Sequence, residues 1–370
     1  MEGDLIRINK WLLPLSWLYG LGVAIRNTLF DVGVLRSRSY KIPVICVGNL
    51  TVGGTGKTPH TEYIVQLLRH RYKVAILSRG YKRKKKGYIL ATDQSTVEDI
   101  GDEPWQMKQK FENVYVAVDK NRRRGIERLY SDPETKDVEV IILDDAFQHR
   151  YVMPGVNILL IDYHRMVTDD QLLPAGRLRE PKDGISRANI VVVTKCPHDI
   201  KPMGFRVIKK ALKLRPYQNL YFSTIRYGLL WGLFHDEERT LSSIAPNESV
   251  LLLSCIASPE QMQYDLSNYS SRITPLAYPD HHEFAPKDIE EINQAYESLP
   301  APKLIITTEK DATRLLNVKG LSNEVKNNLF VLPIRVQFMR NEEENFNEKI
   351  TGYVLKNSRN SILAKGQNDY

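Results

Sequence analysis

The chain has 370 residues, of which 42% are hydrophobic and 26% are charged. This balance excludes a largely disordered chain, and the length predicts two domains. Three cysteines without a CxxC pair argue against a structural zinc site and for a reducing compartment. A net charge of +8 fits an anionic partner such as nucleic acid, anionic lipid or a phosphorylated substrate.

Residues 11–35 are predicted to form a helix that lies at a membrane surface. The segment is apolar and aromatic, but Arg26, Asn27 and Asp31 interrupt it, and the uninterrupted part is shorter than the ~20 residues that a bilayer requires. No small-residue cleavage site follows, which argues against a secretory signal. Two Trp, one Tyr and flanking Lys and Arg residues suit the lipid headgroup region. The alternative is a helix docked on the protein's own core.

The next part of the chain alternates buried-strand and helix patterns. Residues 43–48 form a short apolar run, a glycine-rich turn follows, residues 59–70 have helical periodicity, and residues 73–77 begin another strand. This order is a βαβ unit with parallel strands. The fold class predicted is therefore a P-loop NTPase-type α/β sheet with helices on both faces. Further strands are expected at residues 138–143, 157–161 and 190–193.

A second, smaller α/β domain is expected after residue 225. Strand-like residues 221–231 and 331–338 bracket it, and we interpret them as a paired hinge between domains. The tail at residues 344–357 has a helical pattern. The domains predicted are an interfacial helix, a P-loop kinase domain, a smaller α/β domain joined by a two-stranded hinge, and a helical tail, at residues 1–35, 36–225, 226–338 and 339–370. Inside the smaller domain, two strands and a helix are expected at residues 251–257, 303–308 and 288–299.

The glycine-rich turn has the composition of a phosphate-binding loop. Phosphate binding requires close approach of backbone N–H groups, a lysine for the β- and γ-phosphates and a hydroxyl for Mg²⁺. The general pattern places Gly where this chain has Thr51, so the loop is a variant. ATP and Mg²⁺ are the cofactors predicted. The residues expected to bind them are Gly53, Gly54, Thr55, Gly56, Lys57 and Thr58.

Two acidic residues follow a later strand at a position suited to Mg²⁺. Asp144 and Asp145 end the apolar run VEVIIL. Carboxylates at the C-terminal end of a strand reach the crevice where open α/β sheets bind ligands. They are predicted, with Thr58, to hold Mg²⁺ directly or through water. The alternative for paired acids is a helix cap or a solvated turn.

Several further motifs occur in order along the chain, and together with the loop they identify a family. They are GNLTVGGTGKTP (48–59), LSRGY (77–81), GDEP (101–104), DDAFQHR (144–150), LLPAGRLREP (172–181), PDHHEF (279–284) and TTEKDATRL (307–315). In this combination the chain closely resembles the tetraacyldisaccharide 4′-kinases of lipid A biosynthesis.

The resemblance implies a reaction and a location. The γ-phosphoryl group of ATP would be transferred to the 4′-hydroxyl of a tetraacyldisaccharide 1-phosphate, the lipid A precursor. The enzyme would be peripheral, at the cytoplasmic face of the bacterial inner membrane. The membrane surface and this lipid are the partners expected, with no nucleic acid and no obligate protein partner.

The same resemblance assigns roles to individual residues. It implies that Asp102 is the general base and that His281 orients it or shares its proton, so the two domains would have to meet. From the residues alone, Asp102 reads more readily as a helix cap and His281 as polar surface. Substrate or supporting roles are implied for Tyr81, His149, Arg179 and Glu180.

The chain departs from the family pattern at two positions. Ala146 stands where the family usually has Gly, which we expect to be harmless, and Arg177 replaces a common Pro or Asn and could alter substrate contacts. The basic runs at residues 82–86 and 120–124 are either solvated faces or contacts for anionic lipid or the substrate 1-phosphate.

Three other functions are less compatible with the sequence. A ParA/MinD-like ATPase would have a signature lysine where this chain has Val52. A GTP-driven carrier would have Asp where Pro197 ends the candidate guanine motif. A membrane scaffold that only retains nucleotide would not need His281.

Overall fold

The computed structural model describes residues 8–366 except 257, 258, 281 and 317, and the side chains of residues 359–366 are not described. The chain divides into two compact units. Unit 1 comprises Met1–Ile225 and Val336–Tyr370, and unit 2 comprises Arg226–Arg335. Residues 1–35 and 339–370, which the sequence suggested as separate segments, are therefore grouped with unit 1. His281 lies outside the described residues.

Unit 1 is built on one large sheet, which has nine strands in the described part of the chain. The central strands pair in parallel, as the βαβ pattern predicted, and β3 at one edge is antiparallel to β4. In spatial order the strands are β15 (Ile334–Phe338), β8 (Asn219–Tyr227), β7 (Ile190–Thr194), β6 (Val156–Asp162), β1 (Val44–Asn49), β5 (Val140–Asp144), β2 (Val74–Ser78), β4 (Tyr115–Val118) and β3 (Ile89–Leu90).

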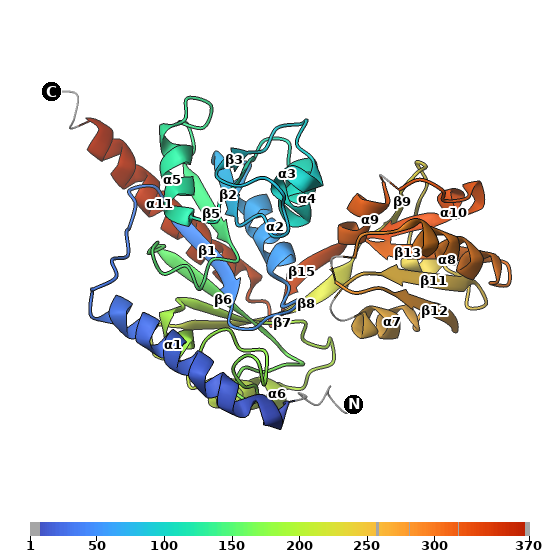
Figure 1. Ribbon diagram of the computed structural model, residues 1–370, viewed down its shortest axis with the longest axis horizontal. Helices are drawn as coiled ribbons and strands as arrows, with labels where there is room; N and C mark the ends of the chain where they lie inside the picture. The colour runs from blue at the N-terminus through green and yellow to red at the C-terminus, as the bar shows by residue number, and fades with distance from the viewer. Residues whose placement is uncertain (1–7, 257–258, 281, 317, 367–370) are drawn as a thin grey trace. The chain divides into compact units, whose positions relative to one another are not determined.

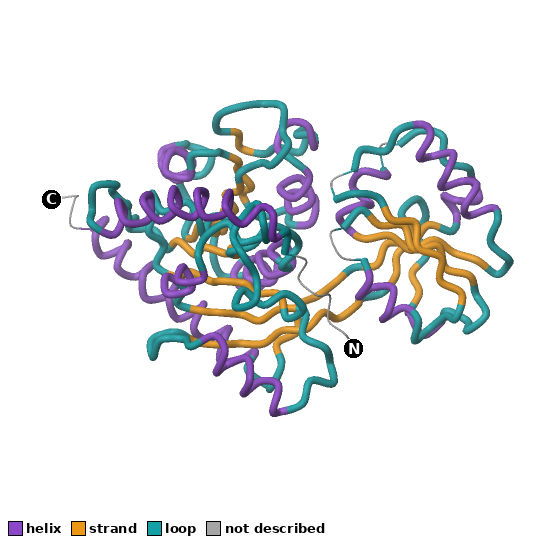
Figure 2. The backbone as a smooth tube through the Cα atoms, turned by 60° about the horizontal axis from the view of Figure 1, so that its bottom comes forward, coloured by secondary structure: helices purple, strands orange, loops and turns teal. Residues whose placement is uncertain are grey.

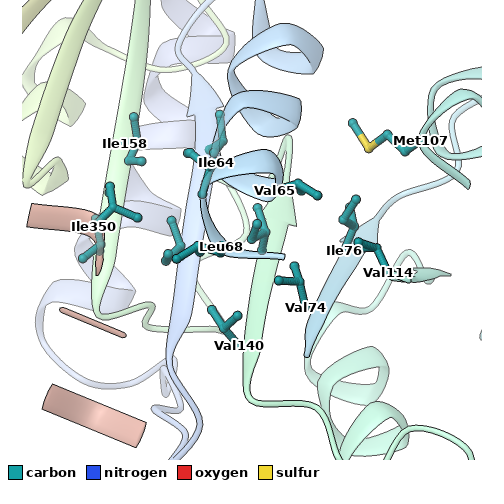
Figure 3. Close-up of a cluster of buried hydrophobic side chains, with 14 of the residues drawn as sticks. Ile64, Val65, Leu68, Val74, Ile76, Met107, Val114, Val140, Ile158 and Ile350 are labelled. Carbon is teal, nitrogen blue, oxygen red and sulfur yellow. The ribbon is translucent and has the colours of Figure 1, made fainter. Parts of the chain in front are cut away.

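Helices cover both faces of this sheet, because alternate residues of each strand are apolar on both sides (Figure 2). One face packs against α2 (Lys57–Leu68), α4 (Asp102–Lys110) and α11 (Glu343–Gly366), and the other against α5 (Arg122–Ser131) and α6 (Pro202–Leu212). Figure 3 shows part of the first core, where these side chains meet: Ile64, Val65 and Leu68 of α2, Met107 of α4, Ile350 of α11, and Val74, Ile76, Val140 and Ile158 of the strands.

The strand order places two loops side by side. The chain leaves β1, crosses through α2 to β2, and later returns to fill the gap between them with β5. β1 therefore lies between β5 and β6, with Val47 of β1 opposite Asp144 of β5. In open α/β sheets, ligands bind at the carboxyl ends of strands where the strand order reverses. The loops that follow β1 and β5 occupy that position.

Two helices near the chain ends complete unit 1. The N-terminal helix begins with a 3₁₀ turn, η1 (Lys10–Leu12), and continues as α1 (Leu13–Asp31). α11 buries Phe346, Ile350 and Val354 completely in the core, so the predicted C-terminal helix is an integral part of unit 1. The remaining short helices of unit 1 are α3 (Val97–Ile100) and η2 (Lys182–Arg187).

Each of the segments 221–231 and 331–338 contains two strands, whereas the sequence suggested one. β8 ends at Tyr227 and the next strand begins at Leu230, while Pro333 separates β14 from β15. Proline cannot donate a ladder hydrogen bond, and its carbonyl instead accepts one from Gly228 N–H at 2.9 Å. The chain therefore changes sheets at these two residues, and β8 and β15 are neighbours in the sheet of unit 1.

Unit 2 is a second α/β sheet covered on both faces, as expected (Figure 1). β11 to β14 pair in parallel, and β9 and β10 extend the sheet with antiparallel pairs. Its strands are β10 (Glu238–Arg239), β9 (Leu230–Gly232), β14 (Leu329–Leu332), β13 (Lys303–Thr308), β11 (Ser249–Ser254) and β12 (Arg272–Ala277). Its helices are η3 (Leu241–Ser243), α7 (Glu260–Leu266), α8 (Pro286–Glu297), α9 (Glu309–Leu315) and α10 (Asn323–Asn327).

Candidate active site

The glycine-rich loop between β1 and α2 exposes backbone donors. Gly53 and Gly56 have φ of +108° and +80°, a backbone conformation that glycine adopts without strain. The N–H groups of Gly53, Gly54 and Gly56 donate to no acceptor within the described part of the chain. They lie at the N-terminus of α2, which begins at Lys57, where the helix dipole favours a bound anion. The loop therefore has the form of a phosphate site.

Side chains around the loop fix its shape. The Asn49 amide donates to the Thr55 hydroxyl at 2.8 Å, and the Thr194 hydroxyl donates to the Thr55 carbonyl at 3.0 Å. Buried His60 lies one turn into α2. Its Nδ1 is 2.7 Å from the Gly56 carbonyl and its Nε2 is 3.0 Å from the Ser223 hydroxyl on β8. A carbonyl only accepts, so Nδ1 carries the proton. Burial lowers the pKa of His60 to about 4, which keeps the ring neutral.

Asp144 is buried beside the loop and is surrounded by hydroxyls. It is 1% exposed, and its two oxygens accept hydrogen bonds at 3.2 Å from Thr61 of α2 and Ser78 of β2. Burial, followed by the nearby negative charges of Glu103 and Asp145, raises the pKa of Asp144 to about 7. The protein thus supplies too little positive charge to ionise this carboxyl fully at neutral pH.

Asp145, in contrast, is held as a carboxylate by two cations. Arg179 Nη1 donates to both of its oxygens, at 3.0 and 3.1 Å, and Lys57 Nζ lies 3.8 Å away. Burial opposes ionisation, but Lys57 and Arg179 outweigh it and lower the pKa. Asp145 has φ of +46°, and the buried Arg122 donates to the carbonyls of Asp144 at 2.9 Å and of Asp145 at 3.4 Å. Arg122 therefore supports the turn that presents the acidic pair.

Asp102 begins α4 and is buried, and the residue before it lies against the loop after β2 that carries Tyr81. Gly101, with φ of +92°, precedes it, and a Cβ at this position would lie 2.8 Å from the Tyr81 carbonyl. Only glycine permits this approach, which brings the GDEP and LSRGY motifs together. Asp102 accepts a hydrogen bond from the Glu103 N–H at 3.1 Å, and Glu103 is close enough to Asp144 to raise its pKa.

His149 and Glu180 are less accessible than Tyr81, whose side chain is 57% exposed. Burial and neighbouring arginines, Arg122 first, lower the pKa of His149 to about 4, so it is a neutral ring. Glu180 is 2% exposed and pairs with Arg187 at 2.6 Å, while its Oε1 has no partner among the described residues. The observed contacts of Glu180 are therefore with the protein itself.

Comparisons with known proteins agree with the family that the motifs suggest. Residues 8–354 match the family described as tetraacyldisaccharide-1-P 4′-kinase. The chain belongs to this family. A tetraacyldisaccharide 4′-kinase of Phocaeicola vulgatus is 55% identical over 98% of this chain and 100% of its own length, and one of Bacteroides thetaiotaomicron is 52% identical over 100% and 99%. The crystal structure of LpxK from Aquifex aeolicus in complex with ATP covers 93% of this chain and 98% of its own, with 30% identity and a TM-score of 0.70.

Membership in this family makes the chain a kinase of lipid A biosynthesis, and the predicted fold class and activity are confirmed. It also decides against the ATPase switch, the GTP-driven carrier and the scaffold.

Sequence reasoning missed four residues that the structure brings to the kinase site: His60, Thr61, Ser78 and Arg122. His60 and Thr61 follow the loop at helical spacing, which could have flagged them, whereas Ser78 and Arg122 depend on strand order.

In unit 2 of the kinase, the neighbourhood of the PDHHEF motif is internally bonded. His282 Nε2 is 2.8 Å from an Asp288 oxygen, and its ring stacks on Tyr278 with centroids 4.8 Å apart. Asp280 pairs with Lys310 of the TTEKDATRL motif at 2.9 Å. The Asp280–Lys310 pair therefore joins the two motifs within unit 2. The pairing of His281 with Asp102 stays a prediction.

Helix α1 of the kinase is docked on unit 1 and also exposes apolar side chains. The Ser16 hydroxyl donates to the Leu172 carbonyl at 3.0 Å, Tyr19 Oη donates to the Arg179 carbonyl at 2.8 Å, and Phe30 is buried. The other face of the helix carries exposed residues: Trp11, Trp17, Leu18, Leu21 and Ile25. Among the helices of the described residues, none has the length and apolar character needed to cross a membrane.

Part of each basic run is paired with acids. Lys84 and Lys85 lie 2.6 Å from Glu98 and Asp99, and Arg124 lies 2.7 Å from Asp119. These pairs reduce the charge available to an anionic partner.

Ala146, the first departure from the family pattern, is buried and is absent from the described non-glycine residues with positive φ, so alanine is unstrained there.

Proposed function

We propose that residues 53–58 hold the phosphates of ATP and that the γ-phosphoryl group passes to the 4′-hydroxyl of a tetraacyldisaccharide 1-phosphate beside Asp144 and Asp145. The observation that carries this proposal is the position of the open loop after β1 directly beside the acidic pair at the end of β5. The relative from Aquifex aeolicus, whose structure is a complex with ATP, supports the choice of nucleotide.

The residues at this position suit Mg²⁺. Asp144 is a buried carboxyl whose pKa is raised for lack of positive charge, and the Thr58 hydroxyl lies on the first turn of α2. Carboxylate and hydroxyl oxygens are the ligands that Mg²⁺ takes beside phosphates. Asp144, Asp145 and Thr58 would therefore hold the ion, which when bound neutralises charge on the phosphates.

In this mechanism the chain's own residues hold the reactants in place and balance their charge. The amides of the loop and Lys57 bind the phosphate oxygens, and Arg179 keeps Asp145 ionised. Asp102, on the first turn of α4, accepts the proton of the sugar hydroxyl, and His281 shares or orients that proton. Tyr81 is exposed at the adjacent loop, where a sugar ring can contact it.

The kinase is also proposed to work as a peripheral protein at the cytoplasmic face of the inner membrane, where its lipid substrate would be. The exposed apolar face of α1 supports this, because exposed Trp17 on α1 and exposed Trp11 on the preceding η1 match an interfacial anchor. Tyr19 of the same helix donates to the Arg179 carbonyl, and the Arg179 side chain contacts Asp145. A membrane surface at α1 would therefore be close to the acidic pair.

The deciding experiment separates the base from the metal ligands. Asp102→Asn should lower kcat by about 10²–10⁴-fold while ATP binding changes little, since a base acts only on the chemical step. Raising the Mg²⁺ concentration should not rescue this variant. Asp137→Asn is the matched control and should retain activity. Asp137 is an exposed carboxylate that precedes β5, at the end of this strand opposite the acidic pair. An unimpaired Asp102→Asn rate, or recovery in high Mg²⁺, would remove the base assignment.

His281→Ala tests the partner of the base. If the two residues act as a unit, the single variant should resemble Asp102→Asn, and the double variant should lose little more than either one. Losses that multiply in the double variant would separate the two roles.

A further inference from the structure

Arg177, the second departure from the family pattern, is fixed against the phosphate loop by its backbone. The Val52 N–H donates to the Arg177 carbonyl at 2.8 Å, and Thr51 and Leu178 form an antiparallel bridge. The Arg177 N–H in turn donates to a carboxylate oxygen of the buried Asp170 at 3.1 Å. Hydrogen bonds therefore hold both the N–H and the carbonyl of Arg177, which fixes the main-chain position from which its side chain extends.

The guanidinium of Arg177 lies beside the loop. A Cβ built on Gly53 would be 3.8 Å from Arg177 Nη1, which is ordinary van der Waals separation. Within the described part of the chain, the guanidinium makes no ion pair and no hydrogen bond, and the residue is exposed. An unpaired cation thus stands next to a glycine whose N–H is open to a ligand.

The other two cations at the loop are partly neutralised. Lys57 and Arg179 both lie against Asp145, at 3.8 and 3.0 Å. A nucleotide triphosphate carries several negative charges, so an unpaired cation beside the loop would add to the neutralisation that Lys57, Arg179 and the proposed Mg²⁺ supply. Guanidinium groups bind phosphate oxygens with two parallel hydrogen bonds, which suits Arg177 to this role.

We propose that Arg177 is a nucleotide-binding residue that donates to the phosphate oxygens of ATP from the Gly53 side of the loop. The proposal rests on the assignment of residues 53–58 as the ATP site. The lipid 1-phosphate has the same chemistry, but Gly53 belongs to the nucleotide loop, which favours ATP.

The test measures ATP binding without lipid and then kinase kinetics. Arg177→Asn, which removes the charge and the guanidinium fork, should weaken ATP binding by about 10- to 100-fold, the range of a hydrogen bond to a charged group. Arg177→Lys keeps the charge without the planar fork and should lose less. Arg215→Asn removes another exposed arginine of unit 1 whose side chain makes no contact with the site, and it should bind ATP as the wild type does.

Each other outcome overturns the proposal in an identifiable way. If Arg177→Asn binds ATP normally but has a raised KM for the lipid, the guanidinium contacts the substrate phosphate. If neither quantity changes, the side chain is solvated. Lys57→Ala serves as the reference: normal ATP binding in that variant would mean that the loop itself is not the ATP site. Thermal midpoints check folding, which the main-chain anchors of Arg177 should preserve.

Discussion

Replacing Asp144 with asparagine should stabilise the metal-free kinase while abolishing its activity. The carboxyl is fully buried, and its pKa is raised from 3.8 to about 7, chiefly by burial. At about 1.4 kcal/mol per pKa unit, ionising this group in the folded chain costs about 4 kcal/mol. Asparagine has nearly the same shape and still accepts a hydrogen bond, but it never ionises.

The sign of the pH dependence follows from proton binding. In the unfolded chain Asp144 loses its proton near pH 3.8, whereas in the folded chain it keeps it up to about pH 7. The folded state therefore binds more protons across this interval, and the free energy of unfolding falls as pH rises. Between pH 5 and pH 8, the wild type should lose stability on the order of 2–3 kcal/mol relative to Asp144→Asn.

The assay is thermal unfolding of both proteins in EDTA, without nucleotide, from pH 5 to pH 8. For a unit of this size, a loss on the order of 2–3 kcal/mol corresponds to roughly 5–10 °C in the difference between midpoints. Added Mg²⁺ should narrow the difference at pH 8 by stabilising only the wild type. The comparison cancels the titrating groups that do not interact with Asp144. A difference that stays constant across the pH range would show that Asp144 is already ionised, and the reasoning would fail.

Three further perturbations test separate parts of the kinase. Lys57→Ala should nearly abolish turnover with folding intact, and a wild-type rate would make the glycine turn only structural. His60→Ala should weaken ATP binding about tenfold by removing the Nδ1 donor to the Gly56 carbonyl, which then keeps only its main-chain hydrogen bond from residue 60. His60→Asn, which keeps a side-chain donor, should lose less, and equal binding in all three proteins contradicts this role. Replacing Trp17 and Leu18 together with serine should reduce sedimentation with anionic lipid vesicles, and unchanged sedimentation would exclude α1 as the anchor.

The choice of point variants in α1 follows from the structure. Deleting the whole N-terminal helix would be a poorer test, because Ser16 and Phe30 are buried against the rest of unit 1 and Tyr19 donates to the Arg179 carbonyl. Deletion would therefore disturb the acidic pair as well as any membrane contact. One face of the segment docks on the protein, whereas the other is exposed and apolar, and its contact with a membrane stays a prediction.

Local features of the sequence determined the fold class, the phosphate loop and the acidic pair. Glycine at positive φ, a lysine and a hydroxyl at the start of a helix, and acids at the end of an apolar strand are each encoded within a few residues. The family motifs determined the reaction for the same reason, since each is a short run that can be read without the fold. The helix at residues 59–70 was placed two residues late, because the loop itself provides the first turn of α2.

Only the tertiary structure decided how these pieces combine. Chain spacing does not specify strand order, and the insertion of β5 between β1 and β2 is what brings Asp144 to Thr61 and Ser78. The raised pKa of Asp144 depends on that burial and therefore has no signature in the sequence. Likewise, Arg177 reads as an isolated departure from a motif, and it becomes a neighbour of Gly53 only because two segments more than a hundred residues apart share main-chain hydrogen bonds.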